Sequence, residues 1–427
     1  MEATDANTAP TVRMQLVLSV PALLVGVVSA SILYGLESLA GLLQTGIWSG
    51  LPKALGVNPA SGWWIFGVLS LTGLAVGLVV WLMPGHGGRD SATTELIADP
   101  LRLAVLPSLI VVTVLALAGG VSLGPENPII AINTGVLVAV IARLWPKVPT
   151  ALVVMTSAAA TIGALFGTPV AAALVFTGVV GAFKAGGAIW DRLFLPLVAA
   201  AAGSITMLMF DQSAGMALTL PAYTSVAPID LLSCAVIAAV AALLGLAASV
   251  ALPRAHSAFR MLRNPVLYIT LGGVLLGVLG AIGGPITLFK GLSQMGQLVA
   301  QRADYGAGQL ALIVAVKIVA LVIAAAAGFR GGRIFPAVFI GVAIGLFASA
   351  LIPGIPLAVA VSAGVLGMVL AVARDGWIAI FVATAVTGGI VVLPVLCIAV
   401  LPVWLLVSRA PRMIVVEPAE QVPAGAS

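Results

Sequence analysis

Long apolar runs, separated by short polar interruptions, extend along the chain from residue 14 to residue 408. Apolar stretches of about 18 residues or more are typical of transmembrane helices, because about 20 residues cross the hydrocarbon core. The pattern predicts apolar segments at 14–36, 64–83, 101–121, 128–145, 150–165, 169–183, 193–210, 229–252, 265–282, 308–327, 336–352, 355–373 and 376–408. Several are too short for a bilayer or are interrupted by Gly and Pro, which indicates tilted, broken and closely packed helices.

The composition narrows the class of protein. Of the 427 residues, 61% are hydrophobic and 8% are charged, and the mean hydropathy is +1.22. A soluble domain carries about 25% charged residues, so this chain has too few polar side chains to cover a surface that faces water. We therefore expect an all-α, polytopic membrane protein.

The basic residues indicate the topology. The net charge of +5 is scattered among the loops, so we expect no nucleic-acid partner. The basic positions that mark segment ends are Arg13, Arg254, Arg260, Arg263, Arg409 and Arg412. By the positive-inside rule these ends face the cytoplasm. We expect a multi-pass protein of the plasma membrane with both termini in the cytoplasm.

An internal repeat divides the chain. The stretches "GVSLGPENP" from Gly120 and "GFRGGRIFP" from Gly328 share the pattern G-x3-G-x3-P, close to half a chain length apart. We expect membrane repeats at 14–212 and 213–412, an N-terminal tail at 1–13, and a short tail at 413–427 without a CBS domain. Interruptions at corresponding positions of two halves indicate a binding site where the repeats meet.

The paired breaks have the chemistry of an anion site. A Gly-rich break followed by Pro leaves the first N–H groups of a helix without intrahelical partners. Within a bilayer these groups need protein, water or a ligand, and the partial positive charge of the helix N-terminus favours an anion. Two such helix starts would bind a small anion weakly enough to release it, as conduction requires.

Glu126 lies inside the first break and is the only charged residue between Leu103 and Ala142. A lone carboxylate within a membrane segment indicates a functional site by default. It can occupy the anion site, compete with the transported ion and swing away when protonated. The alternative is that Glu126 caps the helix or pairs with an arginine.

Two stretches resemble motifs of the ClC chloride channel and transporter family. "SLGPENPIIAINTG" is similar to its G-[KR]-E-G-P motif, and "GGRIFPAVFIGVAIG", with Lys317 in the preceding run, is similar to its G-x-F-x-P segment. The resemblance extends from the first helix to Arg409 and is greatest to a divergent bacterial subgroup of ion-transport proteins. It implies a ClC-like fold of two inverted repeats, a pore within each subunit, and a homodimer.

The resemblance also implies roles for individual residues. Glu126 becomes the gating glutamate, and the backbone N–H groups of Arg333 and Ile334 face the anion. The anion-binding residues become Gly124, Pro125, Asn127, Pro128, Gly332, Arg333, Ile334, Phe335 and Pro336. The family's G-S-G-I-P signature has one counterpart, "GHGGRDSATTEL", which gives a candidate inner anion site at Gly87, Gly88, Arg89 and Asp90.

Two departures from the family affect the expected activity. The stretch "PVAAALVFTGVV" from Pro169 lacks the internal glutamate of proton-coupled members, and the last tyrosine, Tyr305, precedes the expected coordinating one. We expect a small inorganic anion, chloride or a similar halide, to pass a pore gated by Glu126. The alternatives are a proton-coupled antiporter, for example for fluoride, and a symporter for an organic anion.

Other polar residues leave alternatives open. Arg330 and Arg333 replace small or apolar residues of the family; Arg333 can add charge to the pathway, pair with Glu126 or Asp90, or snorkel. His86 can relay protons or be a plain loop residue. Most simply, the acidic residues near segment ends, Glu37, Glu95 and Asp375, are interfacial.

An enzyme is the least favoured class. The two histidines, His86 and His256, lie in no ligand-spaced motif, and no HExxH motif is present. We expect no catalytic residue, metal site or cofactor.

Overall fold

The computed structural model describes residues 12–181, 188–211 and 216–416, which form helices joined by turns and loops. The first half contains α1 (Val12–Thr45), α2 (Leu51–Leu55), α3 (Gly62–Leu82), α4 (Leu106–Ala118), α5 (Glu126–Leu144), α6 (Thr150–Phe166), α7 (Pro169–Gly181) and α8 (Ile189–Met209). The second contains α9 (Pro228–Arg260), α10 (Pro265–Gly283), α11 (Leu292–Ala300), α12 (Ala307–Ala326), α13 (Ile334–Leu351), α14 (Leu357–Ala373), α15 (Gly376–Thr387) and α16 (Leu393–Val407).

The predicted apolar segments correspond to observed helices, with one clear error. The segment 376–408 is two helices, because Gly388 adopts a left-handed φ of 65° and ends α15 before α16 begins. The short helix α11 was not predicted, since it is too short and too polar to stand out as an apolar run. Among the described residues, nine helical segments are long and apolar enough to cross a membrane.

Several helices of the two halves correspond in position and length. The first helices, α1 and α9, have 34 and 33 residues, α6 and α14 both have 17, and α7 and α15 have 13 and 12. The helices that follow the paired breaks, α5 and α13, begin at Glu126 and Ile334. The predicted repeat boundary at 212/213 and most of both predicted tails lie outside the described residues.

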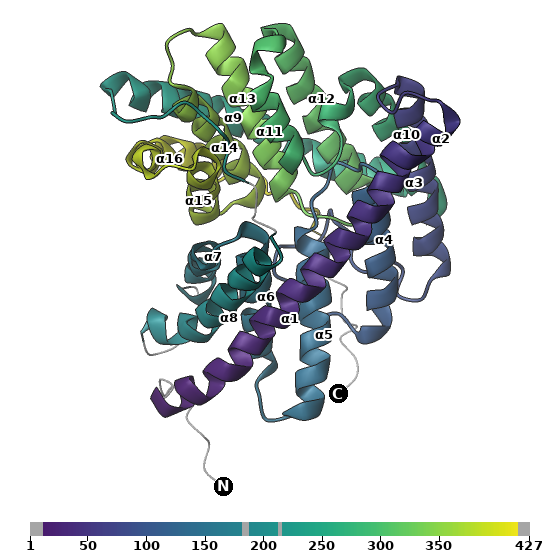
Figure 1. The fold of residues 1–427 in the computed structure, drawn as a ribbon, viewed down its shortest axis with the longest axis vertical. Coiled ribbons are helices and arrows are strands. Elements are labelled where there is room, and N and C mark those ends of the chain that lie inside the picture. Colours follow the sequence, from purple (N-terminus) through teal and green to yellow (C-terminus); the bar gives the residue numbers. More distant parts are fainter. Residues whose placement is uncertain (1–11, 182–187, 212–215, 417–427) are drawn as a thin grey trace, which may run out of the picture.

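Close helix crossings hold the first half together and join it to the second. In Figure 1, α1 runs diagonally past α8, α6 and α4, while α3 packs on α10. A Cβ added to Gly73 of α3 would lie 2.9 Å from the Cα of Gly273 in α10. Glycine therefore permits the backbones to touch, as is common in membrane helix packing.

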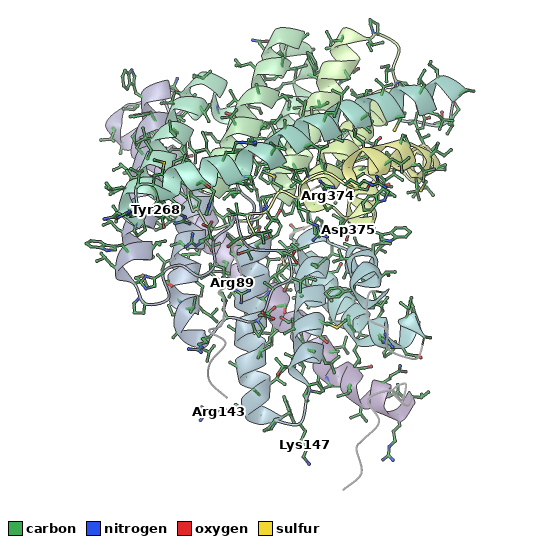
Figure 2. All side chains as sticks on the ribbon, turned by 180° about the vertical axis from the view of Figure 1, so that it is seen from behind. Arg89, Arg143, Lys147, Tyr268, Arg374 and Asp375 are labelled. Atoms are coloured by element: carbon green, nitrogen blue, oxygen red, sulfur yellow. The ribbon has the colours of Figure 1, made fainter. Side chains whose placement is uncertain are left out.

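The interior is formed by α13 and α14, which are buried on nearly every face. A helix that is apolar all round belongs inside the protein. The charged side chains are placed differently: Figure 2 shows Arg374 and Asp375 together at the turn between α14 and α15, and Arg143 and Lys147 at the far end of α5. The start of α13, in contrast, lies inside the protein, because its first residues are buried.

Candidate anion-binding site

The two predicted breaks contact each other directly. The N–H of Gly124 donates to the carbonyl of Gly332 at 2.8 Å, and the N–H of Gly332 donates to the carbonyl of Gly124 at 2.6 Å. In both breaks the earlier glycine, Gly120 or Gly328, is left-handed, with φ of 90° and 83°, a conformation that glycine adopts without strain. The matched sequences therefore adopt matched backbones that pair at the centre of the protein.

The Glu126 side chain lies on this backbone pair and is fully buried. Its Oε1 accepts a hydrogen bond from the N–H of Phe335 at 2.8 Å. A Cβ on Gly124 or Gly332 would overlap the carboxylate oxygen Oε2. The two glycines therefore provide the space in which a carboxylate from the first half reaches the N-terminus of α13.

The second carboxylate oxygen is poorly satisfied. Among the described residues, Glu126 Oε2 is buried without a hydrogen-bond partner. A buried charged oxygen without a donor costs free energy. The helix start thus holds a carboxyl group whose hydrogen bonding is incomplete.

The other predicted residues surround this contact. Pro125 caps α5, Pro128 and Pro336 are buried in the first turns of α5 and α13, and the ring of Phe335 stacks on Phe166 with centroids 5.7 Å apart. The Asn127 amide donates to the carbonyl of Thr94 at 3.4 Å. The anion contacts predicted for the N–H groups of Arg333 and Ile334 stay predictions.

A cavity of about 590 Å³, lined by both apolar and polar side chains, lies beside the start of α13. The polar side chains that line it are Asn127, Arg333, Arg374, Arg412, Glu95 and Asp375. Three guanidinium groups against two carboxylates give it a net positive charge. Such a cavity raises the local concentration of anions next to the site.

The C-terminal segment forms one wall of this cavity. Arg333 donates to the carbonyls of Met413 and, at 3.0 Å, Thr94. Arg374 donates to the carbonyl of Pro411 at 2.6 Å, and the N–H of Val415 to that of Ala92 at 2.8 Å. Arg333 therefore lines the cavity and forms no hydrogen bond with Glu126 or Asp90.

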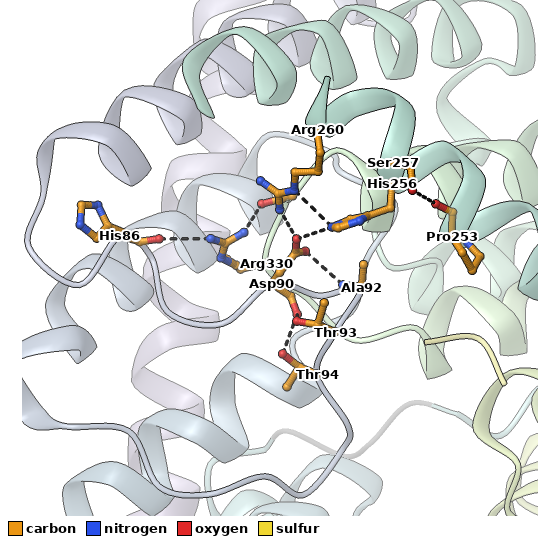
Figure 3. Close-up of polar contacts among 11 residues, drawn as sticks. His86, Asp90, Ala92, Thr93, Thr94, Pro253, His256, Ser257, Arg260 and Arg330 are labelled. Carbon is orange, nitrogen blue, oxygen red and sulfur yellow. Dashed lines mark hydrogen bonds and ion pairs between the residues drawn. The ribbon is translucent and has the colours of Figure 1, made fainter. Parts of the chain in front are cut away.

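The segment between α3 and α4, which contains the candidate inner site, is held by a charged cluster (Figure 3). Asp90 pairs with His256 Nε2 at 3.0 Å and with Arg260, both at the end of α9. Burial raises the pKa of Asp90, but the hydrogen bond with His256 and the charges of Arg330 and Arg260 together lower it to about 2. Asp90 is thus an ionised anchor for this segment.

The same segment is tied to the backbone of the second break. Ser91 Oγ donates to the carbonyl of Gly331 at 2.6 Å and accepts from its N–H at 2.8 Å. Arg330 donates to the carbonyls of Gly87 at 3.0 Å and His86 at 3.1 Å. These bonds fix the chain on both sides of Gly331, next to the glycine that contacts Glu126.

The remaining candidates of the inner site have protein partners. The N–H of Gly88 donates to the carbonyl of Gly85 at 2.9 Å, and the guanidinium of Arg89 lies 4.0 Å from the exposed carboxylate of Asp99. His86, considered separately as a proton relay, has its Nδ1 2.9 Å from the carbonyl of Val80. An inner anion site at Gly87, Gly88, Arg89 and Asp90 stays a prediction.

Four contacts near the site were not predicted. Glu37, expected to be interfacial, pairs with Lys290 at 2.5 Å. The ammonium of Lys290 lies 5.6 Å from the centroid of the Phe335 ring. The other two are the hydrogen bond from Ser91 to Gly331 and the stacking of Phe166 on Phe335. Only Glu37, an acidic residue near the end of an apolar segment, marked any of them in the sequence.

Comparison with known proteins identifies a family and close sequence relatives. The family described as "Voltage gated chloride channel" matches residues 72–405. The chain is 47% identical over 414 residues to "Putative ion-transport protein YfeO" of Escherichia coli (strain K12 / DH10B) and of Shigella boydii serotype 4, which covers 97% of this chain and 98% of each relative.

Two solved structures are similar at 18% sequence identity. They are a CLC-type fluoride/proton antiporter, with a TM-score of 0.69 over 94% of this chain and 98% of that one, and a slow cyanobacterial Cl⁻/H⁺ antiporter, with a TM-score of 0.73 over 92% and 95%. The ClC-like fold predicted from the sequence is confirmed. The chain belongs to the voltage-gated chloride channel (ClC) family, and it is a multi-pass membrane protein.

Proposed function

We propose that this protein moves a small inorganic anion, chloride or a similar halide, across the membrane, and that Glu126 is its gate. The observation that carries the proposal is the hydrogen bond from the N–H of Phe335 to the Glu126 carboxylate. A negative group already lies at the N-terminus of α13, in a space bounded by Gly124 and Gly332. The same donors suit a free anion of similar size.

The gating step follows from this competition. When Glu126 takes up a proton, it loses most of its attraction to the helix N-terminus. The side chain then leaves, and the anion replaces it at the N–H of Phe335 and the neighbouring N–H groups of the first turn. Among the described residues, no cationic side chain is hydrogen-bonded to this position, so the anion is held loosely enough to move on.

The cavity beside α13 supplies the approach to this site. Arg333 and Ile334 belong both to its wall and to the start of α13, and Asn127 follows the gate residue. The cavity is therefore bounded by the two residues that precede Phe335 in the chain. The arginines attract an anion there, and Glu95 and Asp375 limit the net positive charge so that it does not bind too tightly.

Exchange against protons is the second candidate function. Asp375 and Gly178 both line the cavity. Gly178 belongs to α7, the helix in which the internal glutamate of proton-coupled family members is missing. Burial raises the pKa of Asp375, although N–H groups of Ile378 and Trp377 oppose this. A carboxylate in the same cavity as Asn127 and Arg333 has the position that a proton carrier needs. The two solved relatives named as antiporters favour this alternative.

The organisation of the chain belongs to the same proposal. We assign the repeats to residues 14–212 and 213–412, supported by the similar lengths of the helix pairs α1/α9, α5/α13, α6/α14 and α7/α15. The protein is proposed to lie in the plasma membrane as a homodimer, with both termini in the cytoplasm, and to act by transport without covalent chemistry.

The test is anion flux from liposomes that contain the purified protein. Chloride, fluoride and nitrate are compared with and without a pH gradient. Wild-type protein should conduct at least one of them, and only antiport would let a pH gradient drive that anion uphill. Glu126→Gln should remove the pH dependence of flux, whereas Asp99→Asn, which changes an exposed carboxylate, should leave it. Unchanged pH dependence in Glu126→Gln would show that Glu126 is not the gate.

A further inference from the structure

Glu37 is the only carboxylate in α1. Its Oε1 accepts a hydrogen bond from the ammonium of Lys290 at 2.5 Å, and the side chains are 27% and 24% exposed. Carboxylates within membrane helices are costly and usually functional. A partly buried ion pair is a weak source of stability, because desolvation offsets the attraction between the charges. The pair therefore calls for an explanation beyond holding α1 in place.

The ammonium of Lys290 lies close to the proposed gate. It is 5.6 Å from the ring centroid of Phe335, the residue whose N–H donates to Glu126. Its charge also acts on the Glu126 carboxylate. One cation is thus shared between two carboxylates, through a direct bond to Glu37 and at longer range to Glu126.

The loop that carries Lys290 is held rigidly. The fully buried ammonium of Lys317 donates to the carbonyls of Thr287, Leu288 and Phe289 at 2.9, 3.1 and 2.6 Å. The N–H of Phe289 donates to the carbonyl of Gly120 at 2.9 Å. The loop is therefore attached to the first glycine of the first break. The charge of Lys290 has a fixed place relative to the anion site.

The other charged groups near Glu37 and Lys290 indicate which kind of ligand Lys290 could bind. Glu126 approaches from α5, and Lys317 from α12 has its ammonium taken up by loop carbonyls. Of Lys290 and Lys317, only Lys290 has a side chain as its partner, and that side chain can rotate away. If Glu37 leaves, Lys290 offers a charged donor next to Phe335, which suits a monovalent inorganic anion.

We propose that Lys290 is a second anion-binding station beside the Glu126 site, and that Glu37 is its tethered competitor. This inference rests on the proposed function, because it places a further step on the same anion pathway. Each station would then have a carboxylate of the protein that substitutes for the transported ion. Two such stations in series let an arriving anion help to displace the one ahead.

The test is chloride binding to the detergent-solubilised full-length protein, measured by titration calorimetry. Glu37→Gln keeps the shape but removes the competing charge, so the chloride dissociation constant should fall. Lys290→Gln removes the cation, so the constant should rise, by about tenfold if one charge-assisted bond is lost. Lys290→Arg should restore binding toward the wild-type value, and Asp99→Asn should not change it.

The opposite signs separate this role from a purely structural ion pair. A structural pair predicts that both neutral variants lose thermal stability and that chloride affinity stays the same or falls in both. Either of those affinity results overturns the inference. Flux in liposomes is measured in parallel: wild-type protein without anion flux refutes the proposed function, whereas the binding titration still decides the role of Lys290. Flux that responds to Glu126→Gln, with binding unaffected by both variants, refutes only the second station.

Discussion

Glu126 and Phe335, 209 positions apart in the chain, are joined by a 2.8 Å hydrogen bond from the N–H of Phe335 to the carboxylate of Glu126. One break supplies the negative group and the other supplies the helix start that binds it. The contact depends on backbone shape, since Gly124 and Gly332 pair edge to edge beneath the carboxylate. Gating by Glu126 would therefore depend on glycines that carry no chemistry of their own.

Gly332→Ala should displace the gate. The new methyl group would overlap Glu126 Oε2, so the carboxylate must leave its position or the backbone pair must open, at a cost of about 1–3 kcal/mol. Anion flux should become less dependent on pH, with a lower thermal unfolding temperature. Gly67→Ala is the matched control, because no atom lies within 4 Å of its added Cβ. Wild-type pH dependence in Gly332→Ala would contradict the proposed fit.

Asp90→Asn should weaken the anchor of the segment between α3 and α4. The ordinary pKa of 3.8 is lowered to about 2 in the folded protein, so the ionised carboxylate stabilises the fold fully above about pH 4. This contribution, about 2 kcal/mol, is lost as the pH falls from about 4 to about 2. Thermal unfolding in detergent between pH 7 and pH 2 measures it.

The variant should unfold at a lower temperature at pH 7 and should lose less stability on acidification than the wild type. Removing one partner also leaves Arg260 and Arg330 with a less favourable environment, which adds to the loss at neutral pH. Asp99→Asn, in which the replaced side chain is 93% exposed, serves as control. Parallel pH curves for Asp90→Asn and wild type would show that Asp90 is not an ionised anchor.

Arg374→Gln should slow anion access from the cavity. Loss of one guanidinium lowers the positive potential, and salt screens such an effect over about 8 Å at physiological ionic strength. Initial flux should fall severalfold at low ionic strength and approach the wild-type rate at high ionic strength. Arg143→Gln, at the far end of α5 (Figure 2), should leave flux unchanged. A reduction of equal size at all ionic strengths would indicate a structural effect.

Much of the fold follows from local pattern. Gly and Pro punctuate the apolar runs at 120–128 and 328–336, and those positions predicted the starts of α5 and α13 to within two residues. The pattern failed where backbone conformation matters more than polarity, as at Gly388, which ends α15 within a continuous apolar run. It also missed α11, since a short amphipathic helix has no membrane signal.

The site was predictable only where both partners belong to a recognisable motif. Glu126 and Phe335 could be placed near one another because the repeated breaks imply that the two segments meet. The pairs Glu37–Lys290 and Ser91–Gly331 join positions 253 and 240 residues apart. No periodicity or spacing connects them, since tertiary packing alone brings such distant side chains together.

The central claim is that the N-terminus of α13 is an anion site which the Glu126 carboxylate occupies. Its most direct test is an experimental structure of Glu126→Ala with bromide, located by anomalous scattering, beside a wild-type structure in the same salt. We predict bromide within hydrogen-bonding distance of the Phe335 N–H in the variant, and the Glu126 carboxylate at that position in the wild type. Bromide absent from this position in the variant, or bound there in the wild type with Glu126 still on Phe335, would contradict the account.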